Sequence, residues 1–121
     1  MMNRLNHGYQ TQSIRKCNGN RNGYVYALIP VEDDSEPILS HSEDTLFYVN
    51  EPNVAYIGIT NNPLDRLRSH RKKCNKGKKI GMVIFNEAEH PAEATMLEST
   101  ALYNYYTIKG KSPQLNKARY S

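Results

Sequence analysis

The residues of this chain best suited to chemistry lie in "YIGITNNPLDRLRSHRKK", Tyr56 to Lys73. Arg66 follows Tyr56 by ten residues, and His70 comes four residues after Arg66. Residues four apart on a helix lie one turn above each other. A guanidinium fork binds phosphate oxygens in a geometry that lysine cannot reproduce. The segment therefore predicts a helix that holds a phosphate, although a solvated surface helix with a basic face would show the same charges.

The distribution of charge supports a polyanionic ligand. The formal net charge is +4, and eight of the 16 basic residues lie between Arg66 and Lys79. Seven of the 12 acidic residues lie between Val31 and Asn53, where there is no lysine or arginine. Clustered cations neutralise phosphates and release counterions. The candidate nucleic-acid contacts are Arg68, Arg71, Lys72, Lys73 and Lys117.

A second candidate is a carboxylate in an apolar stripe. In the helix expected from Pro91 onward, Glu98 shares its face with Ala94, Ala101 and Tyr105, while Glu93 points away. A buried carboxylate must be protonated, paired with a cation or bound to a metal. Mg²⁺ is often held by one or two carboxylates together with water and substrate phosphates. Glu98 is therefore either one half of a salt bridge, for example with Arg66, or a metal ligand.

The hydrophobic periodicity predicts the elements that would position these side chains. "GYVYALIP" and "VAYIGIT" alternate with the period of a strand, and "IGMVIFNE" indicates a third strand. Asn62 and Pro63 are typical of the first residues of a helix. The run "TLFYV" within the acidic stretch is a candidate extra strand, and no internal repeat is visible.

These residues together resemble the GIY-YIG nuclease family. Tyr56, Ile57 and Gly58 form the intact second half-motif, and "GYVY" supplies the first with Tyr26 as its tyrosine. The family pattern continues through Arg66, His70, Glu98 and Asn116 in the right order. The resemblance covers roughly residues 23–117. It implies an α+β fold with a small three-stranded antiparallel sheet flanked by helices.

Two features depart from the family pattern. Tyr26 and Tyr56 are 30 residues apart, whereas the family joins them by a tight hairpin of about ten residues, so we expect a long acidic insertion in the first hairpin at about 31–53. Tyr24 also competes with Tyr26 for the first position, because the two alternate onto the same face. Tyr26 is preferred because it directly follows the β-branched Val25.

The resemblance implies metal-dependent hydrolysis of phosphodiesters. In that reading Glu98 holds Mg²⁺, or alternatively Mn²⁺, and Arg66 binds the scissile phosphate. Tyr26 is the candidate general base, and Tyr56 positions the water or phosphate. Nearby positive charge from Arg66, His70 and the metal would lower the phenol pKa. Asn116 completes the catalytic set, or only fastens the C-terminal tail.

We therefore expect a DNA endonuclease, with RNA as an alternative substrate and a homodimer as one route to a double-strand break. An inactive nucleic-acid-binding module on the same scaffold and an adaptor that uses the acidic stretch are the rival readings. Residues 1–22 are expected to form a flexible basic arm, and 23–121 the nuclease domain. No apolar segment suggests a signal peptide or membrane span, which favours the cytoplasm and free thiols at Cys17 and Cys74.

Overall fold

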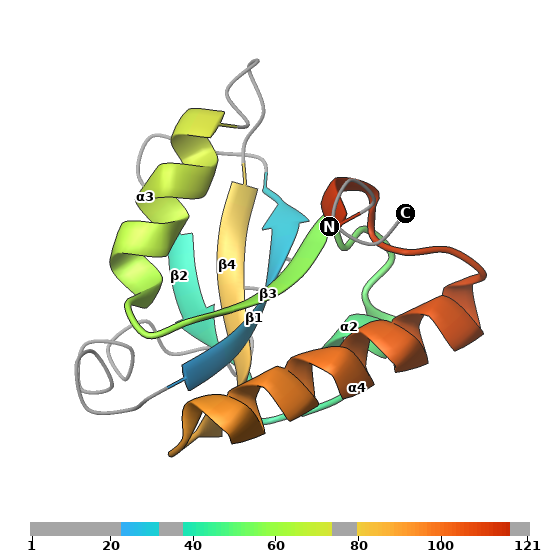
Figure 1. Cartoon of the computed structure of the whole chain (residues 1–121). Coiled ribbons are helices and arrows are strands. Elements are labelled where there is room, and N and C mark those ends of the chain that lie inside the picture. Colours follow the sequence, from blue (N-terminus) through green and yellow to red (C-terminus); the bar gives the residue numbers. More distant parts are fainter. Residues whose placement is uncertain (1–22, 32–37, 74–79, 117–121) are drawn as a thin grey trace.

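The computed structural model describes residues 23–31, 38–73 and 80–116. The predicted N-terminal arm, both cysteines and Lys117 lie outside these residues. Within the described part, the chain forms one mixed sheet with helices on both of its faces (Figure 1). None of the helices in this part has the length and apolar character that a bilayer crossing requires.

The sheet has four strands in the order β2-β4-β1-β3. The central strand β1 (Gly23–Pro30) pairs antiparallel with β3 (Tyr56–Thr60) on one side and with β4 (Ile80–Ala88) on the other. The short strand β2 (Ile38–His41) pairs parallel with β4 at the opposite edge from β3. Among the described strands, β3 therefore lies at an edge and pairs with β1.

The expectation of a three-stranded antiparallel sheet was wrong by one strand. Residues 38–41, which we had placed in the insertion, form β2 and extend the sheet. The run "TLFYV" is not a strand: Phe47–Asn50 forms the short helix α2. A parallel partner is invisible in the sequence, because parallel strands are joined by long crossover connections rather than by a hairpin.

Helix α3 (Pro63–Lys73) begins as predicted. The Asp65 N–H donates to Asn62 Oδ1 at 3.3 Å, and the Asn62 side-chain amide donates to the Asp65 carboxylate at 3.0 Å. These two bonds cap the first turn. The fully buried Leu67 then anchors the helix to the sheet, which is worth about 1.5–3 kcal/mol for a side chain of this size.

Helix α4 (Pro91–Lys109) packs on β1, β3 and β4, on the other face of the sheet. It ends at Gly110, whose left-handed φ of 78° suits glycine and whose N–H donates to the Tyr106 carbonyl at 2.8 Å. A 3₁₀ turn, η2 (Gln114–Asn116), follows and lies against β3. Figure 1 shows α3 beside one face of the sheet and α4 crossing the other.

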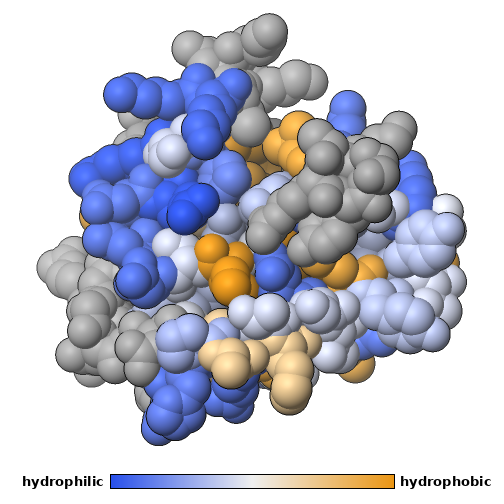
Figure 2. Space-filling view, viewed as in Figure 1, coloured by the Kyte–Doolittle hydropathy of each residue, from blue (hydrophilic) through white to orange (hydrophobic). Residues whose placement is uncertain are grey.

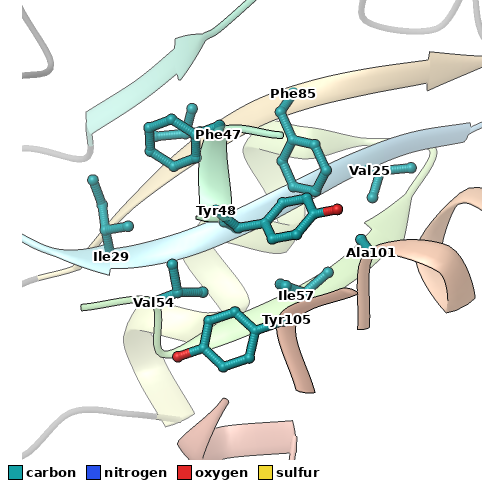
Figure 3. Close-up of a cluster of buried hydrophobic side chains, with 11 residues drawn as sticks. Val25, Ile29, Phe47, Tyr48, Val54, Ile57, Phe85, Ala101 and Tyr105 are labelled. Carbon is teal, nitrogen blue, oxygen red and sulfur yellow. The ribbon is translucent and has the colours of Figure 1, made fainter. Parts of the chain in front are cut away.

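Alternation along β1 divides the core into two clusters. Val25, Ala27 and Ile29 face α2 and α4, where they join the aromatic rings of α2 (Figure 3). Tyr24, Tyr26 and Leu28 point to the other face, where Leu67 of α3 covers them. The motif tyrosine of β1 is therefore placed on the α3 face by the strand period of two.

Candidate active site

Three ring side chains meet between α3 and the β1–β3 pair. The Tyr26 hydroxyl lies 2.8 Å from His70 Nε2, although 44 residues separate the two. The Tyr56 ring centroid lies 4.9 Å from that of His70 and 6.0 Å from that of Tyr26. Tyr26 is fully buried, whereas Tyr56 and His70 are partly exposed. The buried hydroxyl of Tyr26 is thus separated from solvent by the side chains of Tyr56 and His70, which are themselves partly exposed.

Gly58 makes this arrangement possible. It is the register partner of Tyr26 in the β1–β3 pair. A Cβ atom at residue 58 would lie 2.9 Å from the Tyr26 hydroxyl oxygen and 2.6 Å from Tyr56 Cε2. In the structure the space above Gly58 is filled by the two motif tyrosines themselves.

Replacing Gly58 with alanine is therefore expected to damage activity more than stability. Both obstructing atoms are at the ends of side chains, so the rings can move away, but that movement takes the Tyr26 hydroxyl off His70. A displacement of about 1 Å at a catalytic group costs on the order of 10²-fold in rate. Parallel measurements of plasmid cleavage and thermal unfolding would check this. A variant that unfolds at room temperature, or one that cleaves normally, would contradict it.

His70 is a neutral imidazole at physiological pH. Burial, with smaller contributions from the positive charges of Arg66 and Lys73, lowers the pKa of His70 from 6.5 to about 4. The expectation that His70 lends positive charge to the tyrosines is therefore not supported. A neutral Nε2 accepts a hydrogen bond, so we assign the proton of the 2.8 Å contact to the Tyr26 hydroxyl.

This shifted pKa predicts a pH dependence of stability. His70 binds a proton below pH 6.5 when unfolded but only below about 4 when folded, so the unfolded state gains protons across this window. Stability should therefore fall as pH decreases from 6.5 to 4, by on the order of 1–2 kcal/mol after allowance for the partial exposure of His70. Urea unfolding at several pH values would show the slope. His70→Gln should remove it, and His90→Gln, at an exposed histidine, should not.

The cations of α3 have different environments. Arg66, Arg68, Lys72 and Lys73 are exposed, and Figure 2 shows the resulting hydrophilic surface over this helix. Arg68 lies 3.7 Å from the Asp65 carboxylate. Arg71 donates from Nη1 to the Ile80 carbonyl at 2.8 Å and so ties the end of α3 to the start of β4. Arg66 is one turn before His70, close enough to affect its pKa.

Glu98 is buried as the helical periodicity predicted, with 4% of its surface exposed. It lies in the stripe of α4 that includes Ala94, Ala101 and Tyr105. Among the described residues, no three His, Cys, Asp or Glu side chains gather into a metal-binding group. A single carboxylate is a hard oxygen donor of the kind that Mg²⁺ or Mn²⁺ binds together with water and substrate oxygens.

Asn116 is not among the clustered rings. It is fully buried in η2, where its Oδ1 accepts the Ile57 N–H at 2.8 Å and its Nδ2 donates to the Ile57 carbonyl at 2.9 Å. The Leu115 N–H donates to the Ala55 carbonyl at 2.9 Å beside it. The Asn116 amide thus satisfies a backbone N–H and C=O on the edge strand that carries Tyr56.

The structure also distinguishes the tyrosines that precede Tyr56. Tyr24 and Tyr26 share a face, as predicted, but it is Tyr26 that contacts both Tyr56 and His70. Tyr48 is nearer to Tyr56 in sequence, yet it lies in the opposite cluster, beside Phe85 in Figure 3. Its hydroxyl accepts a hydrogen bond from Asn104 at 3.1 Å. Tyr48 is therefore a residue of the hydrophobic core.

Comparison with known proteins gives one match. Residues 38–113 match the GIY-YIG catalytic domain. The matched range contains Tyr56, Arg66, His70 and Glu98 but neither Tyr26 nor Asn116, whose placement comes from the structure. No curated protein and no solved structure matches the chain. Since the matched residues make up more than half of the sequence, the chain belongs to the GIY-YIG family of nucleases.

Proposed function

We propose that the protein is a metal-dependent DNA endonuclease that hydrolyses phosphodiester bonds at the cluster formed by Tyr26, Tyr56, Arg66 and His70. The single observation that carries this is the 2.8 Å contact between the Tyr26 hydroxyl and the neutral imidazole of His70. A phenol is a poor general base near neutral pH unless its own proton has an acceptor. His70 Nε2 is such an acceptor.

In the proposed reaction, Arg66 forks onto two nonbridging oxygens of the scissile phosphate. The Tyr26 oxygen takes a proton from the attacking water while the Tyr26 hydroxyl proton passes to His70 Nε2. Tyr56, which is partly exposed beside both groups, orients the water. The negative phosphate also offsets the charge of Arg66, which raises the pKa of His70 in the complex and makes it a better acceptor.

Glu98 is the proposed ligand of the divalent ion. A divalent ion held by Glu98 would supply charge stabilisation for the phosphodiester reaction. Asn116 holds the backbone of β3 through Ile57, so its part in the reaction is to position Tyr56 rather than to touch the substrate. Arg68, Lys72 and Lys73 contact the remaining phosphates of the strand. Arg71 donates one of its hydrogen bonds to the Ile80 carbonyl.

Plasmid cleavage tests this proposal. Supercoiled DNA is incubated with wild-type, Arg66→Ala or Arg68→Ala protein in the presence of Mg²⁺ or of EDTA. A parallel reaction uses single-stranded RNA in place of the plasmid. Arg66→Ala should lose about 10²–10³-fold in rate, whereas Arg68→Ala removes an equal charge from the same helix and should lose little. DNA binding without cleavage by the wild type would favour an inactive binding module, and equal loss in both variants would show that Arg66 acts only through its charge.

A further inference from the structure

The first residue of β1 lies directly beneath the first turn of α4. This residue is Gly23, and a Cβ atom there would lie 2.4 Å from the Ala94 Cβ atom and 3.7 Å from the Ala94 Cα atom. Carbon atoms in favourable contact lie about 3.5–4.0 Å apart. Any side chain at residue 23 would therefore push this end of α4 away from the sheet by about 1 Å.

Small residues and a short connection form this corner of the fold. Gly23 pairs with Ala88, the last residue of β4, and only residues 89–90 separate Ala88 from the start of α4. Ala88 and Ala94 are both 1% exposed. The Ala94 N–H donates to the His90 carbonyl at 3.1 Å, so the helix is already closed where it passes over β1. The connection is too short to absorb a shift at Ala94, which would therefore move the helix itself.

Glu98 lies between the two points at which α4 is held on the sheet. It follows Ala94 by one helical turn on the same buried face, and Ala101 and Tyr105 continue that face. Ala101 and Tyr105 belong to the core cluster of Figure 3, which holds the second half of the helix. Raising the first turn of α4 about this anchor would lift Glu98, whereas Tyr105 would move little.

The position of Glu98 matters because a divalent ion is demanding about the position of its ligands. Mg²⁺ requires near-ideal octahedral geometry with oxygen atoms at about 2.0–2.1 Å. Groups that hold a metal ligand in place typically contribute about 10–100-fold to metal affinity. A shift of part of an ångström at the carboxylate is therefore large on the scale of the bond it makes.

We propose that Gly23 is a positioning residue for Glu98: the missing side chain lets α4 rest on β1, and this contact sets the depth of the Glu98 carboxylate. The inference rests on the proposed function, in which Glu98 holds the divalent ion. Gly23 itself touches neither the ion nor the substrate and acts only through α4. The two glycines thus serve opposite faces of the sheet, since Gly58 makes room for the tyrosine rings and Gly23 makes room for a helix.

Thiol labelling tests the packing step without metal or nucleic acid. In a background of Cys17→Ser, Cys74→Ser and Glu98→Cys, residue 98 carries the single thiol, and its reaction with a chromogenic disulfide reagent is followed by absorbance. Gly23→Ala should raise the labelling rate several-fold, because residue 98 becomes less buried.

Two further variants separate this effect from a loss of stability. Ala94→Gly weakens the helix without creating an overlap. The exchanged variant, Gly23→Ala with Ala94→Gly, leaves the new Cβ atom 3.7 Å from the Cα atom of residue 94, an ordinary contact. Its labelling rate should equal that of Ala94→Gly and lie below that of Gly23→Ala. A Gly23→Ala rate no higher than that of Ala94→Gly would overturn the proposal.

Electron paramagnetic resonance of Mn²⁺ in the presence of DNA tests the consequence, with Glu98 in place. Gly23→Ala should weaken Mn²⁺ binding about 10–100-fold, and the exchanged variant should bind nearly as tightly as the wild type. Wild-type affinity in Gly23→Ala, together with weaker binding by Glu98→Gln, would refute the positioning role. Binding that Glu98→Gln leaves unchanged would instead refute the proposed metal site, and the thiol rates would still decide whether Gly23 sets the depth of residue 98.

The exchanged variant also decides the case in which Gly23→Ala does not fold, as circular dichroism would show. The exchanged variant must then fold and bind Mn²⁺ nearly as tightly as the wild type, because the overlap is gone. A folded exchanged variant with the Mn²⁺ affinity of Glu98→Gln, or one that does not fold, would contradict the proposal.

Discussion

Tyr26→Phe should remove nearly all cleavage while leaving the protein folded. The change deletes one oxygen atom, which in the proposed reaction takes the proton of the attacking water. General acid–base groups contribute about 10²–10⁴-fold in rate, and we expect a loss in that range. The cost in stability is far smaller, about 1 kcal/mol for one buried hydrogen bond to His70.

Tyr48→Phe is the matched control for Tyr26→Phe. Tyr48 is as deeply buried as Tyr26, and its hydroxyl also accepts a hydrogen bond, from Asn104, but it lies on the far face of the sheet. Both variants should lose a similar free energy of unfolding in urea, while only Tyr26→Phe loses plasmid cleavage under single-turnover conditions. A Tyr26→Phe protein that retains most of its rate would exclude Tyr26 as the base.

Glu98→Gln should be the second most damaging change, with a loss of about 10²–10³-fold in rate. Glutamine preserves the size of the side chain and one acceptor oxygen but lacks the charge that a hard divalent ion requires. The loss should be accompanied by weaker binding of Mn²⁺ in the presence of DNA. Electron paramagnetic resonance reports that binding independently of cleavage.

The control for Glu98→Gln is Glu51→Gln. Glu51 and Glu98 are the buried carboxylates among the described residues, with 3% and 4% exposure. The Glu51 backbone carbonyl accepts a hydrogen bond from Lys109 at 3.3 Å, at the C-terminal end of α4. Glu51→Gln removes the charge of this buried side chain and should therefore change stability, but it should leave the metal dependence of cleavage intact. If both variants need more Mn²⁺ to the same extent, Glu98 is a structural carboxylate and not the ligand.

Local sequence signals predicted the elements that carry most of the site. Asn62 and Pro63 indicated where α3 begins, and alternation in "YIGIT" indicated β3. Helical periodicity placed Glu98 in the buried stripe of α4. These features depend on neighbours within one turn or one strand, where propensity and burial agree.

Most of the errors and omissions involve long-range contacts. Nothing near residues 38–41 indicates a parallel partner 43 residues away in β4, and four apolar residues in "TLFYV" fit a strand as well as a helix turn. The pKa of His70 depends on burial against β1 and β3, so the sequence could suggest a charged histidine where the fold makes a neutral one. The role of Asn116 likewise required its contact with Ile57, 59 residues earlier.

The two motif tyrosines lie on paired strands although another strand of the sheet lies between them in the sequence. The chain leaves the central strand β1, adds β2 at the far edge and α2 below the sheet, and returns to form β3. The residues between Tyr26 and Tyr56 thus add a strand at the edge opposite β3, and Tyr26 lies in register with Gly58. The two tyrosines are 30 residues apart in the sequence, yet the antiparallel pairing of β1 with β3 brings their rings together.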